Sequence, residues 1–198
     1  VFVTGSTTNA SNNKDIIVIA YNAATGAENW KKVVTGTANS NDVPTAIVLS
    51  GANIVFTGQV DNTTTGKDCI TMKMACSNGT QVWQKVYDFS NSTNLGTALV
   101  KDSTGNIGVT GTAYNGSYIE IHSILYDSTG TQLWVNILPT GLNFMDANPK
   151  IATDTIANHF YISGQIQKAT TDVLCYQITP IGGITSWSVI IDGAANGT

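Results

Sequence analysis

The sequence predicts an all-β fold made of one unit repeated four times, because two independent markers keep the same period. The first marker is a glycine that follows an apolar run and a threonine or serine, and the second is tryptophan. The glycines are Gly5, Gly58, Gly111 and Gly164, spaced 53, 53 and 53 residues apart, and the tryptophans are Trp30, Trp83, Trp134 and Trp187, spaced 53, 51 and 53. The repeat units therefore run approximately over 1–53, 54–106, 107–159 and 160–198.

Each unit contains candidates for four short strands. In the second unit these are residues 54–57, 69–74 and 81–86, and the run 45–49 supplies the strand that precedes them. A second set of glycines stands four residues before each tryptophan and between two apolar runs, which predicts hairpin turns because glycine reaches positive φ at little cost. These glycines are Gly26, Gly79, Gly130 and Gly183. No run of ten residues has helical periodicity.

Four strands in a repeat of about 50 residues are typical of a β-propeller blade. We therefore predict a propeller of four antiparallel blades of about 53 residues, with 1–198 forming a single domain or a fragment of one. Residues 1–5 already belong to the strand that ends in Thr-Gly, so the first blade lacks its innermost strand. A fragment of a longer protein is the favoured explanation, and closure with a second copy or through unidentified flanking segments stays open.

The composition excludes several classes of partner. Net charge is −4, 11% of residues are charged, and all nine basic residues are lysine, which disfavours nucleic acid because arginine is the preferred reader of phosphates and bases. No apolar run approaches the roughly 20 residues that span a bilayer, so no membrane span is expected. The polar surface comes from 28 threonines and 19 asparagines more than from ions, which suits an extracellular or cell-surface setting.

Residues with catalytic or metal-binding chemistry are scattered through the chain. Cys69, Cys76 and Cys175 form no Cys-x-x-Cys pair and have no histidine nearby, so no metal is predicted. His122 and His159 stand alone, and a lone histidine in a strand is usually solvated or hydrogen-bonded. Most aspartates occupy turn sequences such as 102–105 and 127–130, where the carboxylate bonds nearby backbone. We predict no catalytic residue and no cofactor.

The repeat resembles a known family. The unit Val3-Thr4-Gly5, Asp15–Gly26, Trp30, Asp42–Leu49 and Asn53–Gly58 is similar to the bacterial SBBP-type β-propeller repeat. The resemblance covers all four units and implies a propeller of secreted or surface proteins, often within long multidomain chains, without implying an activity. Residues 20–30 are also similar to the tryptophan-docking motif of quinoprotein propellers, a structural girdle that locks blades together. Units two to four keep only the glycine and the tryptophan of that motif.

Function is expected in the irregular loops, because loops on a rigid scaffold carry most binding sites. The tryptophans and the glycines are equivalent positions of a repeat, so packing is their expected role. The loop 139–149 departs most from its equivalents. It places Leu142, Phe144 and Met145 where the other units have Asn, Ser and Thr. This predicts a small apolar contact site for a partner or a neighbouring domain, with Asp146 as a further member.

The leading functional reading is a noncatalytic binding or structural module of a secreted or cell-surface protein, with adhesion or scaffolding as its role. Its partners would be other domains of a longer chain or another copy of itself, with carbohydrate as a further ligand class. One alternative is a hydrolase or lyase that acts on an extracellular carbohydrate at the propeller face. Another is a subunit of an extracellular fibre or assembly, joined through unpaired strand edges.

Overall fold

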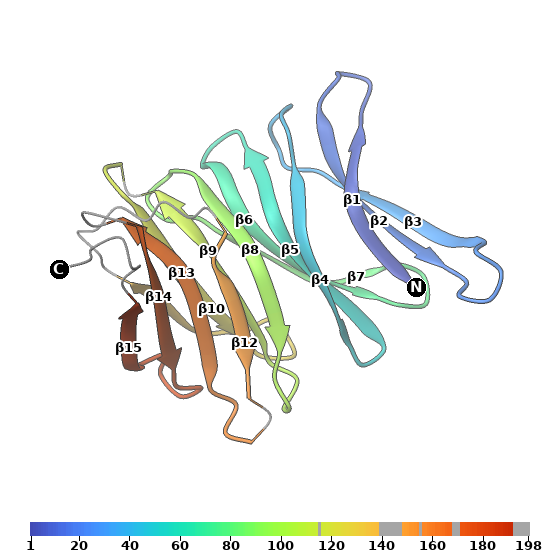
Figure 1. Ribbon diagram of the computed structural model, residues 1–198. Coiled ribbons are helices and arrows are strands. Elements are labelled where there is room, and N and C mark those ends of the chain that lie inside the picture. The colour runs from blue at the N-terminus through green and yellow to red at the C-terminus, as the bar shows by residue number, and fades with distance from the viewer. Residues whose placement is uncertain (115, 139–147, 155, 168–170, 192–198) are drawn as a thin grey trace. The chain divides into compact units, whose positions relative to one another are not determined.

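A computed structural model describes residues 1–114, 116–138, 148–154, 156–167 and 171–191 (Figure 1). Fifteen strands and no helix occur in these ranges, so the predicted all-β architecture is confirmed. The strands are β1 (Phe2–Thr8), β2 (Lys14–Tyr21), β3 (Glu28–Val34), β4 (Val43–Ser50), β5 (Asn53–Asn62), β6 (Gly66–Ala75), β7 (Gln81–Tyr87), β8 (Asn94–Lys101), β9 (Ile107–Tyr114), β10 (Ile119–Tyr126), β11 (Gln132–Leu138), β12 (Lys150–Thr153), β13 (Phe160–Gln167), β14 (Thr171–Ile178) and β15 (Thr185–Ile191).

The strands form four antiparallel sheets in chain order, which is the four-blade architecture that the repeat predicts. The first sheet has three strands, β1-β2-β3, and the other three have four each: β4 to β7, β8 to β11 and β12 to β15. The first blade therefore lacks its innermost strand, as expected. The chain divides into two compact units, Val1–Gly96 and Thr97–Thr198, which are described separately. Below, the first and the second unit are these two compact units, and a single repeat is called a sheet or a blade. No helix long and apolar enough to cross a membrane is found in the described ranges.

The predicted hairpin turns are present in all four sheets. Gly26, Gly79, Gly130 and Gly183 have φ values of 71°, 69°, 88° and 62°. These values lie in the left-handed region, which side chains other than glycine, asparagine and aspartate rarely adopt. Each turn is followed by a break in register between the two strands that it joins, as between Ala20 and Tyr21 in the first sheet.

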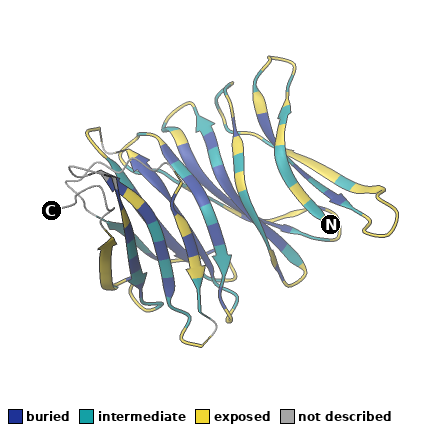
Figure 2. Ribbon diagram, in the orientation of Figure 1, coloured by how far each residue is buried: buried dark blue, intermediate teal, exposed yellow. Residues whose placement is uncertain are grey.

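Each compact unit has its own hydrophobic core between two neighbouring sheets. In the first unit, Ile16 and Val18 of β2 pack with Ile54 and Phe56 of β5 and with alternate residues of β6. In the second unit, Ile121 and Leu125 of β10 pack with residues of β13 and β14. Burial alternates along part of β2, because successive side chains of a strand point to opposite faces, whereas β9 is buried on both faces. The strand β6 is buried along most of its length, whereas β3 is mostly exposed (Figure 2).

A tryptophan of one sheet docks on the turn glycine of the next sheet, and this contact joins both pairs of sheets. In the first unit, Trp30 Nε1 donates a hydrogen bond of 2.9 Å to the carbonyl of Cys76, and a Cβ added at Gly79 would lie 2.8 Å from the indole ring. In the second unit, Trp134 Nε1 donates to the carbonyl of Pro180 at 3.0 Å, and a Cβ at Gly183 would lie 2.7 Å from the ring. We call this contact the Trp–Gly joint.

The threonine and the glycine of the Thr-Gly marker contact the two strands on either side of their own strand. Thr57 Oγ1 donates to the carbonyl of Ile70 on the neighbouring strand at 2.8 Å. A Cβ added at Gly58 would lie 2.2 Å from the carbonyl oxygen of Val43, on the innermost strand β4. Glycine is therefore required because β4 is bulged next to Pro44 and its backbone presses against this position.

A buried carboxylate anchors the segment that links the first sheet to the second. Asp42 is 0% exposed and accepts two short backbone hydrogen bonds, from Gly36 N–H to Oδ2 and from Asp61 N–H to Oδ1, both at 2.7 Å. The first donor lies in the linker and the second near the end of β5. This one side chain therefore ties the linker to the sheet end that β5 and β6 form.

Substitution of the two equivalent turn glycines measures the strength of the Trp–Gly joint. Gly26→Ala and Gly79→Ala share a left-handed φ, which costs roughly 1 kcal/mol at each site. A Cβ at Gly26 has nothing within 4 Å, whereas one at Gly79 meets Trp30. We expect Gly79→Ala to lower the free energy of unfolding by about 1–3 kcal/mol more than Gly26→Ala, as overpacking of a core contact does. Urea denaturation measures both values, and equal losses would contradict the joint.

Candidate binding face on the fourth sheet

The site predicted from the sequence lies outside the described residues. Leu142, Phe144, Met145 and Asp146 all fall within 139–147. Their role as a contact site stays a prediction. The structure instead directs attention to a surface on the fourth sheet.

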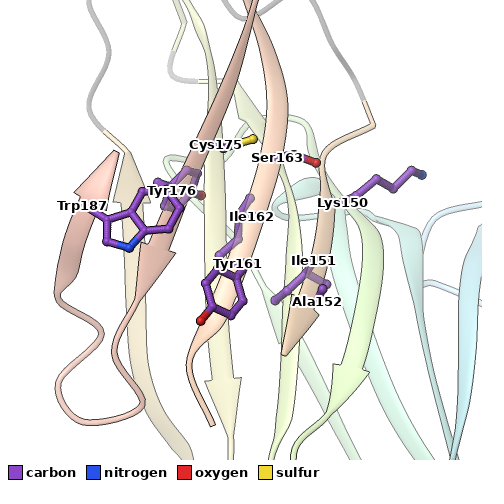
Figure 3. A pocket seen from close by; sticks show the side chains of 9 residues that line it. All are labelled: Lys150, Ile151, Ala152, Tyr161, Ile162, Ser163, Cys175, Tyr176 and Trp187. Carbon is purple, nitrogen blue, oxygen red and sulfur yellow. The ribbon is translucent and has the colours of Figure 1, made fainter. Parts of the chain in front are cut away.

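An open pocket of about 300 Å³ lies on the face of the sheet β12 to β15. Figure 3 shows Trp187 on β15 and Tyr161 on β13 turned toward the same side, with Lys150 and Ala152 on β12 beside them. The lining of the pocket is mostly apolar, and its residues lie on β12, β13, β14 and β15. The lining residues are Lys150, Ile151, Ala152, Tyr161, Ile162, Ser163, Cys175, Tyr176 and Trp187. We call the side of this sheet that carries Tyr161, Val173, Trp187 and Val189 the outer face.

The outer face is the uncovered equivalent of a surface that is partly buried in the first sheet and buried at Trp134 in the third. Tyr161 and Trp187 occupy the same places in their sheet as Phe2 and Trp30 in the first, and both pairs form tilted ring contacts. Their centroids are 6.3 Å and 6.0 Å apart. In the first unit the aromatic pair packs against the core that β5 and β6 complete.

Residues of the outer face are more exposed to solvent than their equivalents in the third sheet. Trp187 is 43% exposed, whereas Trp134, at the equivalent position of the third sheet, is 6% exposed. Val173 of the outer face is also 43% exposed, whereas its equivalent in the third sheet, Ile121, is 0% exposed. Figure 2 accordingly shows β15 as an exposed strand. Large apolar side chains gathered on one exposed face mark a surface for interaction.

The polar groups around the pocket are held by neighbours within the same blade. Lys150 Nζ donates to Asn148 Oδ1 at 2.6 Å, and the Tyr161 hydroxyl donates to Asp154 Oδ2 at 3.1 Å. Gln177 Nε2 donates to the Tyr161 oxygen at 3.0 Å. These bonds hold the phenol ring of Tyr161 beside the indole of Trp187.

The groups with the most perturbed acid–base chemistry lie inside the protein, not at the pocket surface. His122 is 0% exposed, and loss of solvation lowers its pKa to about 3, with a hydrogen bond from the imidazole to the backbone of Thr112 opposing the shift. His122 is therefore buried and hydrogen-bonded, which is the second of the two states expected for a lone strand histidine. Burial likewise raises the pKa of the Cys69 thiol to about 12 and raises the pKa of the Tyr176 phenol. Neutral buried groups of this kind are poor nucleophiles and poor bases.

The turn aspartates bond to their own backbone, as predicted. Asp127 Oδ1 accepts hydrogen bonds from the Thr129 hydroxyl and from the N–H groups of Thr129 and Thr131, and these bonds lower the pKa of the carboxyl. The Ala157 N–H, with further donors, has the same effect on the pKa of Asp154. No group of three or more His, Cys, Asp or Glu side chains that could hold a metal occurs in the described ranges. All three cysteines are free thiols.

The tryptophans predicted as packing residues divide into two kinds. Trp30 and Trp134 form Trp–Gly joints and Trp83 is buried, whereas Trp187 lies half exposed on the outer face. Sequence reasoning missed Tyr161 and Val173 as members of this face. The available signal was their equivalence with Phe2 and Ile121. The chain matches no protein-family model and no curated protein.

The buried histidine predicts a pH dependence of stability. The pKa of His122 falls from 6.5 in the unfolded chain to about 3 in the folded one, so the unfolded chain binds the extra proton between these values. Stability from this group is present above pH 6.5 and is lost as the pH falls, by at most about 1.4 kcal/mol per pH unit. His122→Leu, which installs the residue found at the equivalent Leu174, should flatten the decline.

Chemical denaturation between pH 7 and pH 4 tests this expectation, with His159→Gln as the control for loss of a histidine outside the core. His159 is 32% exposed beside Asp154. If the curves of the wild type and His122→Leu stay parallel across this range, His122 does not carry the proton linkage.

Proposed function

We propose that this chain is a noncatalytic binding or structural module of a secreted or cell-surface protein, and that it binds through the outer face. The observation that carries the proposal is the exposed Trp187, which contacts the half-buried Tyr161, whereas the equivalent Trp30 packs against a core and Trp134 is buried. Tyrosine and tryptophan are the residues most enriched in the energetically dominant parts of protein interfaces. The composition, poor in charge and rich in threonine and asparagine, supports the extracellular setting.

The partner that fits the outer face is a second copy of the chain, joined head to tail. Trp187 is one half of a Trp–Gly joint, and the first sheet carries the other half. A Cβ added at Gly26 would meet nothing within 4 Å, and Val1 and Val3 of the same sheet are 63% and 45% exposed. Their equivalents in the second sheet, Ile54 and Phe56, are 0% exposed. Two complementary uncovered surfaces on one molecule define a heterologous interface.

The geometry of the existing joints specifies the expected contact. Each indole N–H donates to the carbonyl three residues before the turn glycine, at Cys76 and at Pro180. The corresponding acceptor in the first sheet is the carbonyl of Ala23. Trp187 of one copy would therefore lie on Gly26 of the next and donate to Ala23. This contact also supports assembly into an extracellular fibre, the second candidate function, because a heterologous contact that does not close extends indefinitely.

A carbohydrate-cleaving enzyme receives no support from this site. Glycoside hydrolysis uses two carboxyl groups roughly 5 to 9.5 Å apart. The pocket lining contains no aspartate or glutamate. The aromatic pair is tilted by 46°, so the two rings offer no common plane on which a sugar could stack.

Sedimentation velocity over a concentration series tests the proposal. We expect the wild type to self-associate, and Trp187→Ser with Val189→Ser to abolish association, because both residues lie on the outer face. Val189 is 50% exposed. Leu133→Ser is the matched control, since Leu133 is also 50% exposed but precedes the docked Trp134 in β11. A wild type that stays monomeric throughout contradicts the proposal.

A mixing experiment separates the head-to-tail contact from a symmetric one. Gly26→Asn keeps a residue that tolerates left-handed backbone but places a side chain where the indole would lie. Neither Gly26→Asn nor the Trp187→Ser, Val189→Ser protein should associate alone. Mixed together they should form dimers and nothing larger, because each supplies one intact half. Absence of such dimers, or association of either variant alone, contradicts the head-to-tail contact.

A further inference from the structure

Among the described residues, no strand pairs with the edge of β1 that faces away from β2. This free edge is distinct from the outer face and plays no part in the proposed function. We infer that this edge accepts an added β-strand whose sequence is of the type found in β4, Asp42-Val-Pro-Thr-Ala-Ile-Val-Leu-Ser50. The argument rests on the internal repeat, because the second sheet shows how an innermost strand lies on the strand equivalent to β1.

The backbone of β1 presents hydrogen-bonding groups to the open edge. Val1 and Tyr21 exchange two bonds, of 2.9 Å and 2.8 Å, so alternate residues of β1 are bonded to β2. In an antiparallel pair the residues between them point their N–H and C=O groups to the other side. Phe2, Thr4 and Ser6 therefore face the edge. In the second sheet the equivalent Val55 and Thr57 pair with β4.

The position of Gly5 preserves the space that an added strand would fill. In the second sheet, a Cβ at Gly58 would lie 2.2 Å from the Val43 carbonyl oxygen and 2.7 Å from Pro44 Cα, both in β4. At Gly5, the equivalent site of the first sheet, a Cβ would meet nothing within 4 Å. The glycine that an innermost strand requires is thus present on β1, while no such strand lies there among the described residues.

An apolar pocket beside β1 matches the side chains of the added strand. It has a volume of about 430 Å³ and is lined by Val1, Phe2, Ile47, Val48, Leu49 and Ile54, all in the first compact unit. In the second unit, Ala98 and Val100 of the innermost strand β8 pack against the core that includes Ile151, the equivalent of Ile47. The alanine and valine of an added strand would occupy this pocket in the same way.

The occupant is therefore an extended segment with a small residue at the bulge, followed by Thr-Ala and two aliphatic residues. Main-chain hydrogen bonds provide affinity in strand addition, and alternate side-chain pockets provide specificity. An exposed edge of this kind is also a site of unwanted pairing unless a specific strand covers it. A strand supplied by another polypeptide segment would pair with this edge and would also protect it from unwanted pairing.

A synthetic peptide that copies residues 42–50 tests the inference by isothermal titration calorimetry with the intact 198-residue chain. We expect saturable binding of one peptide per chain. A peptide with proline in place of its alanine and second valine should not bind, because proline removes the N–H groups that would pair with Thr4 and Phe2. Absence of binding by the unmodified peptide, or equal binding by both peptides, would overturn the inference.

Gly5→Ala supplies the decisive variant. Its Cβ lies in open space in the free chain, so folding should be unaffected, but it would collide with the backbone of a bound peptide as at Gly58. We expect peptide affinity to fall by more than about tenfold, the size of an overpacking penalty. Unchanged affinity would place the peptide elsewhere and overturn the inference.

Amide hydrogen exchange gives a readout that needs no variant. Peptide binding should slow exchange at Phe2, Thr4 and Ser6 and leave Val3 and Gly5 little changed, because only the former face the edge. Uniform or absent protection would count against strand addition. The Trp187→Ser, Val189→Ser protein should bind the peptide normally, so failure at the β1 edge is distinguishable from failure of the proposed self-association.

Discussion

The Trp–Gly joint is the contact on which the arrangement of each compact unit depends. One indole lies flat against a backbone turn that has no side chain, and its N–H satisfies a carbonyl of that turn. The contact combines apolar burial with a directional hydrogen bond, so it specifies both the spacing and the relative position of two sheets. Glycine serves two needs at once, because the same residue supplies left-handed backbone and a surface bare enough for the ring.

The remaining repeat markers organise each blade from within. The threonine of the Thr-Gly pair bonds to the neighbouring strand, and the glycine admits the bulged innermost strand. The loops at the sheet ends are held by buried or partly buried carboxylates such as Asp42, which accept several backbone N–H groups each. Because these polar groups are satisfied locally, the packed faces of the sheets can carry the large apolar side chains of the two cores.

The sequence predicted the fold because the period repeats in two residue types, and strands, turns and the absent innermost strand all followed from their spacing. It could not show that Trp and turn Gly are partners, because both keep the same period whether or not they touch. Nor could it separate Trp187 from Trp30, since cover depends on a neighbouring sheet and not on local residues. His122 illustrates the same limit. It is fully buried, as are Ile121 and Ser123 on either side of it, and this burial is set by packing that the linear pattern does not record.

Each Trp–Gly joint uses the tryptophan of one sheet and the turn glycine of the next sheet. Every repeat of the sequence contains both residues. Duplication of a whole repeat therefore adds one tryptophan and one turn glycine. Arrays of this repeat can thus grow or shrink by complete units without redesign of any contact, as in other quasi-one-dimensional repeat proteins. The number of blades then follows from the number of repeats that the gene encodes, whereas the residues that join the blades are present in every repeat.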